Sequence, residues 1–212
     1  MLSIRLPLSI SSPTTPCMTA KTTPVYPNGL SVLWSIISDM DILIKTERLT
    51  LRFLKPDDLL SVHEYAGNPE NTRYMMFLPN QTVEETKEFI ERALAEASKD
   101  NPSFYEFAVE LEGRVIGGAG LYLEGDCAEL GWIINNRYQR KGYATEAAFA
   151  LCDFAFKRLG LSRIIAHCDT RNRPSARVME KLGMTLVSEG ERIYERTGET
   201  AKEYMYEIKR GI

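Results

Sequence analysis

Alternation of apolar and polar residues predicts most strands of this chain. In Arg48–Phe53, leucine and phenylalanine alternate with arginine and threonine, the pattern of a half-buried strand. Similar segments follow in close succession, and Glu112-Gly113 supplies a tight turn between two of them. The consecutive segments 105–111, 114–123 and 127–134 therefore predict an antiparallel meander, and further strands are expected at 163–168, 185–194 and 202–209.

Apolar residues at helical spacing predict about four helices. The first follows Pro56-Asp57-Asp58, with proline and acids in its first turn. The second starts at Thr82, which opens a capping box with Glu85. A long apolar helix should cover Gly142–Leu159, and a short one should open near Asn172 and close at Gly183. The order β, α, α, βββ, α, β, α, ββ predicts an α+β domain with helices on a mostly antiparallel mixed sheet.

The first 39 residues differ from the rest of the chain. Pro7–Pro27 is rich in serine, threonine and proline and is not expected to pack a core. Leu30–Ile37 has the composition for one or two helical turns. We expect residues 1–39 to be a disordered extension and residues 40–212 to form the folded domain.

Bulk composition excludes several classes of protein. The 212 residues include 26 basic and 29 acidic ones, a net charge of −3, which offers no basic face for nucleic acid. No apolar run approaches the ~18 residues of a membrane-spanning helix. The four cysteines form no CxxC pair and only two histidines are present, so no metal site is expected. Scattered cysteines indicate a reducing compartment, and we expect a cytoplasmic protein.

The most informative segment is Glu129–Ala147. A strand ends near Ile134, a basic turn follows, and a helix begins at about Gly142. The free N–H groups and positive dipole of a helix start favour an anion there. The alternative is an ordinary strand–turn–helix with a solvated basic turn. The spacing matches neither a Walker loop nor the dinucleotide Gly-x-Gly-x-x-Gly pattern.

A family resemblance favours the anion site. Gln139-Arg140-Lys141-Gly142-Tyr143-Ala144 resembles the Gln/Arg-x-x-Gly-x-Gly/Ala motif of GNAT acetyltransferases. The chain is most similar to their RimJ/RimL-like, or ribosomal-protein-alanine acetyltransferase-like, branch. The resemblance runs from about Met40 to Lys209 and includes Thr46-Glu47-Arg48-Leu49, Glu129-Leu-Gly-Trp, Asn172-x-x-Ser175 and Glu180-Lys181-Leu-Gly-Met184.

The resemblance implies the GNAT fold, a sheet of about 6–7 strands with a central pair of parallel, splayed strands flanked by about four helices. It also implies acetyl-CoA as the cosubstrate and no metal. The pantetheine arm would pair with backbone near the end of the strand Glu129–Ile134, and the pyrophosphate would bind the amides that follow. The implied cofactor-binding residues are Trp132, Ile133, Ile134, Gln139, Arg140, Lys141, Gly142, Tyr143, Ala144, Thr145 and Asn172. The alternative for Asn172 is a helix cap, and the two roles are compatible.

Acetyl transfer to an amine needs groups that accept and donate protons. Glu129 occupies a position that resembles the base of many relatives, although it also fits a surface strand residue. His167 is a second candidate base, or a structural histidine. Many GNAT enzymes place an acidic tyrosine where this chain has Met179. Ser175 is the substitute candidate for the acid, with an ordinary first-turn serine as the alternative.

We therefore expect an N-acetyltransferase that transfers acetyl directly to a primary amine, either a protein N-terminus or a small molecule. Tyr74–Pro79 is a candidate for the acceptor mouth, or plain packing of a connecting segment. A catalytically silent acyl-CoA-binding or sensing module of the same fold is the alternative, because the acid is unassigned. An unrelated nucleotide-phosphate binder is a third hypothesis. The protein is expected to be a monomer or weak homodimer, with no nucleic acid or membrane as a partner.

Overall fold

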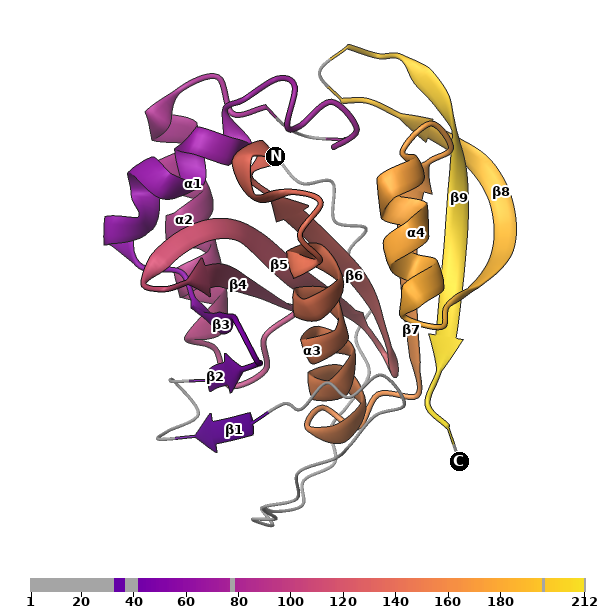
Figure 1. The fold of residues 1–212 in the computed structure, drawn as a ribbon, viewed down its shortest axis with the longest axis horizontal. Helices are drawn as coiled ribbons and strands as arrows, with labels where there is room; N and C mark the ends of the chain where they lie inside the picture. Colours follow the sequence, from indigo (N-terminus) through magenta and orange to yellow (C-terminus); the bar gives the residue numbers. More distant parts are fainter. Residues whose placement is uncertain (1–32, 37–41, 77–78, 196, 212) are drawn as a thin grey trace.

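A single mixed sheet forms the frame of the fold in the computed structural model (Figure 1), which describes residues 33–36, 42–76, 79–195 and 197–211. Within these residues the sheet has nine strands in the order β1-β2-β3-β4-β5-β6-β7-β9-β8. The strands are β1 (Leu33–Ile36), β2 (Ile42–Lys45), β3 (Thr50–Phe53), β4 (Phe104–Leu111), β5 (Arg114–Glu124), β6 (Cys127–Ile134), β7 (Arg163–Asp169), β8 (Thr185–Ile193) and β9 (Thr200–Lys209). The predicted α+β architecture is confirmed.

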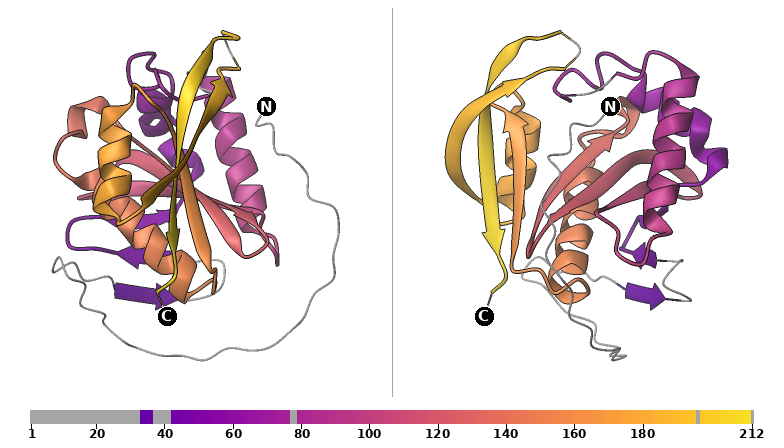
Figure 2. Two further views of the ribbon diagram at one scale, coloured as in Figure 1. Left: turned by 90° about the vertical axis from the view of Figure 1, so that its right-hand side faces the viewer. Right: turned by 180° about the vertical axis from the view of Figure 1, so that it is seen from behind.

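Four α-helices cover the two faces of this sheet within the described residues: α1 (Leu59–Ala66), α2 (Val83–Ala97), α3 (Tyr143–Lys157) and α4 (Arg173–Lys181). Short 3-10 turns, η1 (Pro56–Asp58) and η2 (Asn136–Tyr138), precede α1 and α3. Helices α1 and α2 lie on one face, and α3 and α4 lie on the other (Figure 2). The predicted cap of α2 is present, since the Thr82 side chain accepts a hydrogen bond from the Glu85 N–H.

The central pair β6 and β7 is parallel, whereas the other neighbouring strands are antiparallel. Their pairing covers only Cys127–Glu129 against Arg163–Ile165. Beyond these residues the two strands diverge toward their C-terminal ends, as the right-hand view of Figure 2 shows. The predicted splayed pair is therefore present, and it opens the middle of the sheet.

Helix α3 packs closely on the sheet because its buried face is rich in alanine. Ala147, Ala148 and Ala150 are fully buried, and small side chains allow the helix axis to approach the strands. The ring of Phe154 meets the ring of Phe107 on β4 edge-on, with centroids 5.8 Å apart. Complete burial of such a side chain contributes about 2 kcal/mol, so α3 is held firmly above β5 and β6.

The sheet extends further at its N-terminal edge than the sequence predicts. Residues 33–36 form β1, so the expectation of helical turns over Leu30–Ile37 is wrong for these four residues. Strand β1 pairs antiparallel with β2, and β2 pairs with β3. A domain start at residue 40 would separate β1 from its partner. Leu33–Ile36 and Ile42–Lys45 lack the strict alternation of Arg48–Phe53, so the pattern does not mark them as strands. Most of the predicted extension lies outside the described residues.

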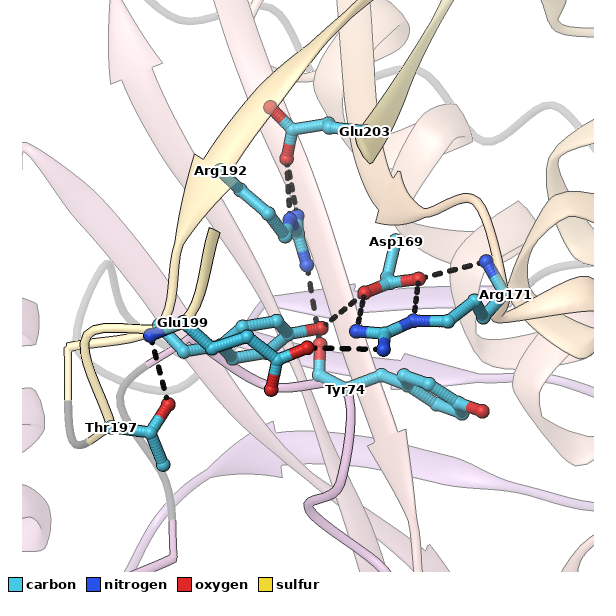
Figure 3. A network of polar contacts seen from close by, with 8 residues as sticks. Tyr74, Asp169, Arg171, Arg192, Thr197, Glu199 and Glu203 are labelled. Atoms are coloured by element: carbon cyan, nitrogen blue, oxygen red, sulfur yellow. Dashed lines mark hydrogen bonds and ion pairs between the residues drawn. The ribbon is translucent and has the colours of Figure 1, made fainter. Parts of the chain in front are cut away.

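Asp169 ties the end of β7 to the C-terminal hairpin (Figure 3). Its carboxylate is completely buried. Arg171 donates to it from Nε at 2.9 Å and from Nη2 at 2.7 Å, and the Tyr194 hydroxyl donates at 2.6 Å. Burial alone would raise the pKa of Asp169, but the Arg171 and Tyr194 hydrogen bonds lower it to about 2.

The same hairpin is tied to the segment between α1 and α2. Arg192 is 8% exposed and donates from Nε to Glu203 at 2.7 Å and from Nη1 to the Tyr74 carbonyl at 3.2 Å. The Glu195 N–H donates to the Met76 carbonyl at 3.0 Å. Two regions far apart in the sequence are thereby joined above the diverging strands.

The Asp169 carboxylate should be a major local source of stability. We expect Asp169→Asn to lower the free energy of unfolding by about 2 kcal/mol at pH 7, because charge-assisted hydrogen bonds are lost in a buried place. Chemical denaturation measures this. The folded pKa lies below the ordinary value of about 3.9, so the stabilisation is present above that value and is lost as pH falls through about 2. The difference between wild type and variant should shrink over that interval.

Glu199→Gln is the matched control. Glu199 accepts from the same Arg171 at 3.0 Å, but its side chain is 52% exposed, and exposed pairs contribute less than about 1 kcal/mol. Equal destabilisation by the two variants would contradict the role given to burial of Asp169.

Candidate active site

A cavity of about 430 Å³ lies where β6 and β7 diverge. Side chains from both faces of the sheet reach it through the opening. Helices α1 and α2 contribute from one face, and α4 contributes Asn172 and Ser175 from the other. Tyr74, Met75 and Met76, from the segment predicted as an acceptor mouth, also line it. Phe77 and Leu78 of that segment lie outside the described residues.

The floor of the cavity is formed by glycines, which have no side chains. Gly118 and Gly120 of β5 and Gly131 of β6 line the cavity, and Gly120 is the direct partner of Gly131. A Cβ at position 120 would lie 2.6 Å from Glu106 Oε1. Residues without side chains therefore leave room here for groups that reach over the sheet from neighbouring elements.

The predicted site residues fall into two neighbouring groups. Glu129, Trp132, Ile133, Asn172 and Ser175 line the cavity together. The remaining residues lie outside the cavity lining, in the segment from the end of β6 to the first turn of α3; these are Ile134, Gln139, Arg140, Lys141, Gly142, Tyr143, Ala144 and Thr145. The Gln139 side chain donates to the Ile134 carbonyl at 2.9 Å, which closes this loop on the end of β6.

Glu129 and His167 form a pair across the two parallel strands. His167 Nδ1 lies 3.0 Å from Glu129 Oε1, and a carboxylate acceptor requires that this nitrogen carries the proton. The hydrogen bond to Glu129 raises the pKa of His167, although burial opposes it. Both candidate bases named from the sequence are therefore in contact.

Helix α4 presents its first turn to the cavity. The Asn172 side chain accepts from the Ser175 N–H at 3.3 Å, so Asn172 is a helix cap as well as a cavity residue. Ser175 lines the same wall. Met179 lies one turn further, is 1% exposed and belongs to the core. It does not line the cavity, and its thioether has no proton to donate.

The loop before α3 has the backbone geometry of an anion site. Arg140 and Gly142 adopt left-handed conformations, with φ of +63° and +86°. Left-handed residues alternating with ordinary ones turn successive N–H groups toward a common point. The first N–H of the helix with a partner one turn back is that of Glu146, which donates to Gly142. The preceding N–H groups of the first turn have no intrahelical acceptor.

A buried carboxylate anchors this loop to the start of β3. Glu146 is 4% exposed. Its Oε1 accepts from the Thr46 hydroxyl at 2.6 Å and from the Arg48 N–H at 2.9 Å, and its Oε2 accepts from Arg48 Nε at 2.7 Å. Arg48 also donates to the Lys141 carbonyl at 3.0 Å and covers the Tyr143 ring at 4.7 Å. In the sequence, Thr46 and Arg48 were identified only as part of a motif that matches the family.

A second carboxylate inside the cavity was missed by the sequence analysis. Glu106 on β4 accepts a hydrogen bond from the Tyr122 hydroxyl on β5. Burial raises the pKa of Glu106 to about 7, against the lowering effect of that hydrogen bond. Strand alternation places Glu106 on the face of β4 opposite the core residue Phe107. From the sequence alone, that face would be expected to be exposed to solvent. Only the packing of α1 and α2 over that face could reveal its burial.

Two general properties complete the description. Among the described residues, no cluster of histidine, cysteine, aspartate or glutamate side chains is arranged to hold a metal ion. No helix in this part of the chain is long and apolar enough to cross a membrane.

Comparisons with known proteins agree with this geometry. A family model described as an acetyltransferase (GNAT) domain matches residues 48–185. The N-acetyltransferase YnaD of Bacillus subtilis is 33% identical over 167 residues, which cover 78% of this chain and 95% of YnaD. The spermidine N(1)-acetyltransferase of Escherichia coli K12 is 30% identical over 148 residues, 68% of this chain and 76% of that protein.

A solved structure is also similar to this chain in sequence and fold. The crystal structure of a GNAT-family acetyltransferase from Bacillus anthracis is 34% identical, covers 79% of this chain and 98% of its own, and superposes with a TM-score of 0.69. The family match spans more than half of the sequence and includes the loop before α3, the diverging strands and α4. The chain therefore belongs to the GNAT family and is an acetyl-CoA-dependent acetyltransferase.

Proposed function

We propose that the protein transfers acetyl from acetyl-CoA to a primary amine by direct attack while both are bound. The observation that carries this proposal is the opening between β6 and β7, through which α4 on one face and α1 and α2 on the other line a single cavity. Two substrates that enter from opposite faces would meet there. The acceptor is a protein N-terminus or a small-molecule amine.

The residues of the chain fit acetyl-CoA, which supplies the acetyl group as a thioester. The diverging strands leave the β7-facing edge of Trp132–Ile134 unpaired with β7, so an extended pantetheine arm can pair there as an added strand does. Amides from Gln139 to Thr145 would hold the pyrophosphate, with Arg140 and Lys141 adding charge. The left-handed backbone at Arg140 and Gly142 supports this assignment.

Two cavity residues are proposed to move protons. Glu129 would accept a proton from the amine nitrogen as it attacks, with His167 holding its carboxylate in place at 3.0 Å. Ser175 would deliver a proton to the leaving sulfur, resupplied by water. Asn172 would contact the cofactor arm while capping α4.

A silent acyl-CoA-binding module remains the second candidate function. The observation that favours it is Met179, which is buried in the core at the position where many relatives carry an acidic tyrosine. We also propose a cytoplasmic monomer or weak dimer. The described cysteines, Cys127, Cys152 and Cys168, are unpaired and buried, which fits a reducing compartment.

Thiol release from acetyl-CoA tests the proposed function. The acceptors are peptides with N-terminal alanine or serine, spermidine and kanamycin, and we expect turnover with at least one class. Calorimetry with coenzyme A runs in parallel. Tight binding of coenzyme A without turnover on any acceptor would support the silent module instead.

Gly142→Asp should weaken coenzyme A binding at least about tenfold. The variant places a negative charge beside the proposed pyrophosphate site and a side chain where φ is +86°. Gly125→Asp is the matched control, since Gly125 also has a left-handed backbone (φ +62°) but lies in the β5–β6 turn with open space around it. Calorimetry that gives the same dissociation constant for both variants would remove the pyrophosphate assignment.

Ser175→Ala should lower kcat about 10²-fold while leaving coenzyme A affinity within about twofold, because the hydroxyl acts only on the leaving sulfur. The helix cap uses the Ser175 N–H, which alanine retains, so folding should not change. Steady-state kinetics and calorimetry separate the two effects. Ser188→Ala on the exposed part of β8 is the control. An unchanged kcat in Ser175→Ala would remove Ser175 as the acid and leave that role to water or another group.

A further inference from the structure

Acetylation of a protonated amine removes two protons from nitrogen. An ammonium group carries three hydrogens in addition to its carbon, and the amide product carries one. One proton must leave before nitrogen can attack, and the second leaves as the bond to carbon forms. The proposed function uses Glu129 for only one of these protons. The other proton leaves either to solvent before the amine binds or to a second acceptor inside the cavity.

Glu106 is placed to be that acceptor. Its carboxylate lies over Gly120, since a Cβ there would be 2.6 Å from Oε1. Gly120 is the direct partner of Gly131, and neighbouring strands lie about 4.8 Å apart. Glu129 is two residues before Gly131 on the same face of β6. Both carboxylates therefore flank the cavity floor at Gly131, next to Trp132 and Ile133, where the pantetheine arm is proposed to pair.

Tyr122 stands between these carboxylates. It donates its hydroxyl proton to Glu106 and is the direct strand partner of Glu129. Directly paired residues share a face with Cβ atoms about 5 Å apart. An amine above Gly131 would therefore meet one carboxylate on each side, with the phenol holding Glu106 in position.

The surroundings of Glu106 favour neutral groups. Titratable and charged side chains line the cavity from each element around it. They are Tyr65 of α1, Tyr74 of the segment between α1 and α2, Glu85, Glu88 and Arg92 of α2, Tyr122 of β5, Glu129 of β6, His167 and Cys168 of β7, and Arg192 of β8. The dominant influence on Glu106 is nevertheless burial, which brings its pKa to about 7. The same burial lowers the pKa of an ammonium group. Proton transfer between the two converts an ion pair into two neutral groups, which a desolvated cavity favours.

We propose that Glu106 is the first proton acceptor of the reaction, taking one proton from the ammonium group of the acceptor before Glu129 takes the second. This proposal rests on the proposed function, direct acetyl transfer to a primary amine. It assigns Glu106 a catalytic role and Tyr122 a positioning role through Glu106.

The steps balance in atoms and charge. Glu106 takes one proton and leaves a neutral amine. The nitrogen lone pair bonds to the acetyl carbon, the carbon–sulfur bond breaks, and its electron pair stays on sulfur. Glu129 takes the second proton from nitrogen, and Ser175 gives one to sulfur. Glu106 and Glu129 then return two protons to water, Ser175 regains one, and one net proton is released.

The pH dependence of kcat/KM tests the assignment, using the best acceptor from the thiol-release panel. Glu106→Gln should lose about 10²-fold at pH 7. The loss should shrink toward wild-type rates above the pKa of the acceptor amine, because that amine then enters already neutral. Glu129→Gln should remain impaired at every pH, because the second proton still has to leave. Glu124→Gln removes the same single negative charge at an exposed position at the end of β5, and its kcat/KM should equal that of the wild type.

Tyr122→Phe gives an independent test. The Tyr122 hydrogen bond lowers the pKa of Glu106, so its removal should raise that pKa. The fall of kcat/KM on the acidic side of the pH profile should then begin at a higher pH. Infrared spectroscopy of the free enzyme supplies a readout without turnover. The stretch of a protonated carboxyl group should titrate near pH 7 in wild type, move upward in Tyr122→Phe and be absent in Glu106→Gln.

The outcomes separate the two proposals. A Glu106→Gln defect of the same size at every pH, or an unchanged acidic limb, would overturn the role of Glu106 and leave the proposed function intact. A loss confined to the acceptor KM, with kcat unchanged, would make Glu106 a binding group and also overturn it. Wild-type enzyme that turns over no amine would overturn both. Equal coenzyme A affinity in all variants confirms that each is folded.

Discussion

The site depends on the short pairing of β6 with β7. Hydrogen-bonded register between these parallel strands covers Cys127–Glu129 and ends there. A fully paired sheet would separate the helices of one face from those of the other. Because the strands part, the last residues of β6 keep an open backbone edge, and residues from both faces line one cavity. Both proposed substrate approaches follow from this single departure from regular pairing.

A divided sheet needs support on each side of the opening. On the α3 side, Glu146 fastens the loop before the helix to Thr46 and Arg48, so the left-handed backbone at Arg140 and Gly142 is held in shape. On the other side, Asp169 and Arg192 bind the C-terminal hairpin to the end of β7 and to the segment at Tyr74. Buried charged groups with several hydrogen-bond partners, the Glu146 and Asp169 carboxylates and the Arg192 guanidinium, hold these elements together, which is the arrangement that makes a buried charge tolerable.

The ionisable groups of the cavity differ by their exposure. Glu129 is half exposed and pairs with His167, whereas Glu106 is partly buried in the cavity that α1 and α2 line and accepts a hydrogen bond from the Tyr122 phenol. One carboxylate is therefore half exposed to solvent, whereas burial raises the pKa of the other to about 7. Pairs of acids with such different environments are common where an enzyme moves protons in sequence.

The sequence by itself determined the helices, the meander and the loop Gln139–Thr145, because each depends on local spacing and turn chemistry. The splayed pair was expected only from the family resemblance. It also named Glu129, Ser175 and Asn172, which the fold brings to one cavity. Only the tertiary structure showed β1 and β2, which form through antiparallel pairing with each other and of β2 with β3. Only the tertiary structure could place Glu106, since alternation along β4 specifies a face of the sheet. Whether that face meets water or two helices is decided by residues distant in the chain.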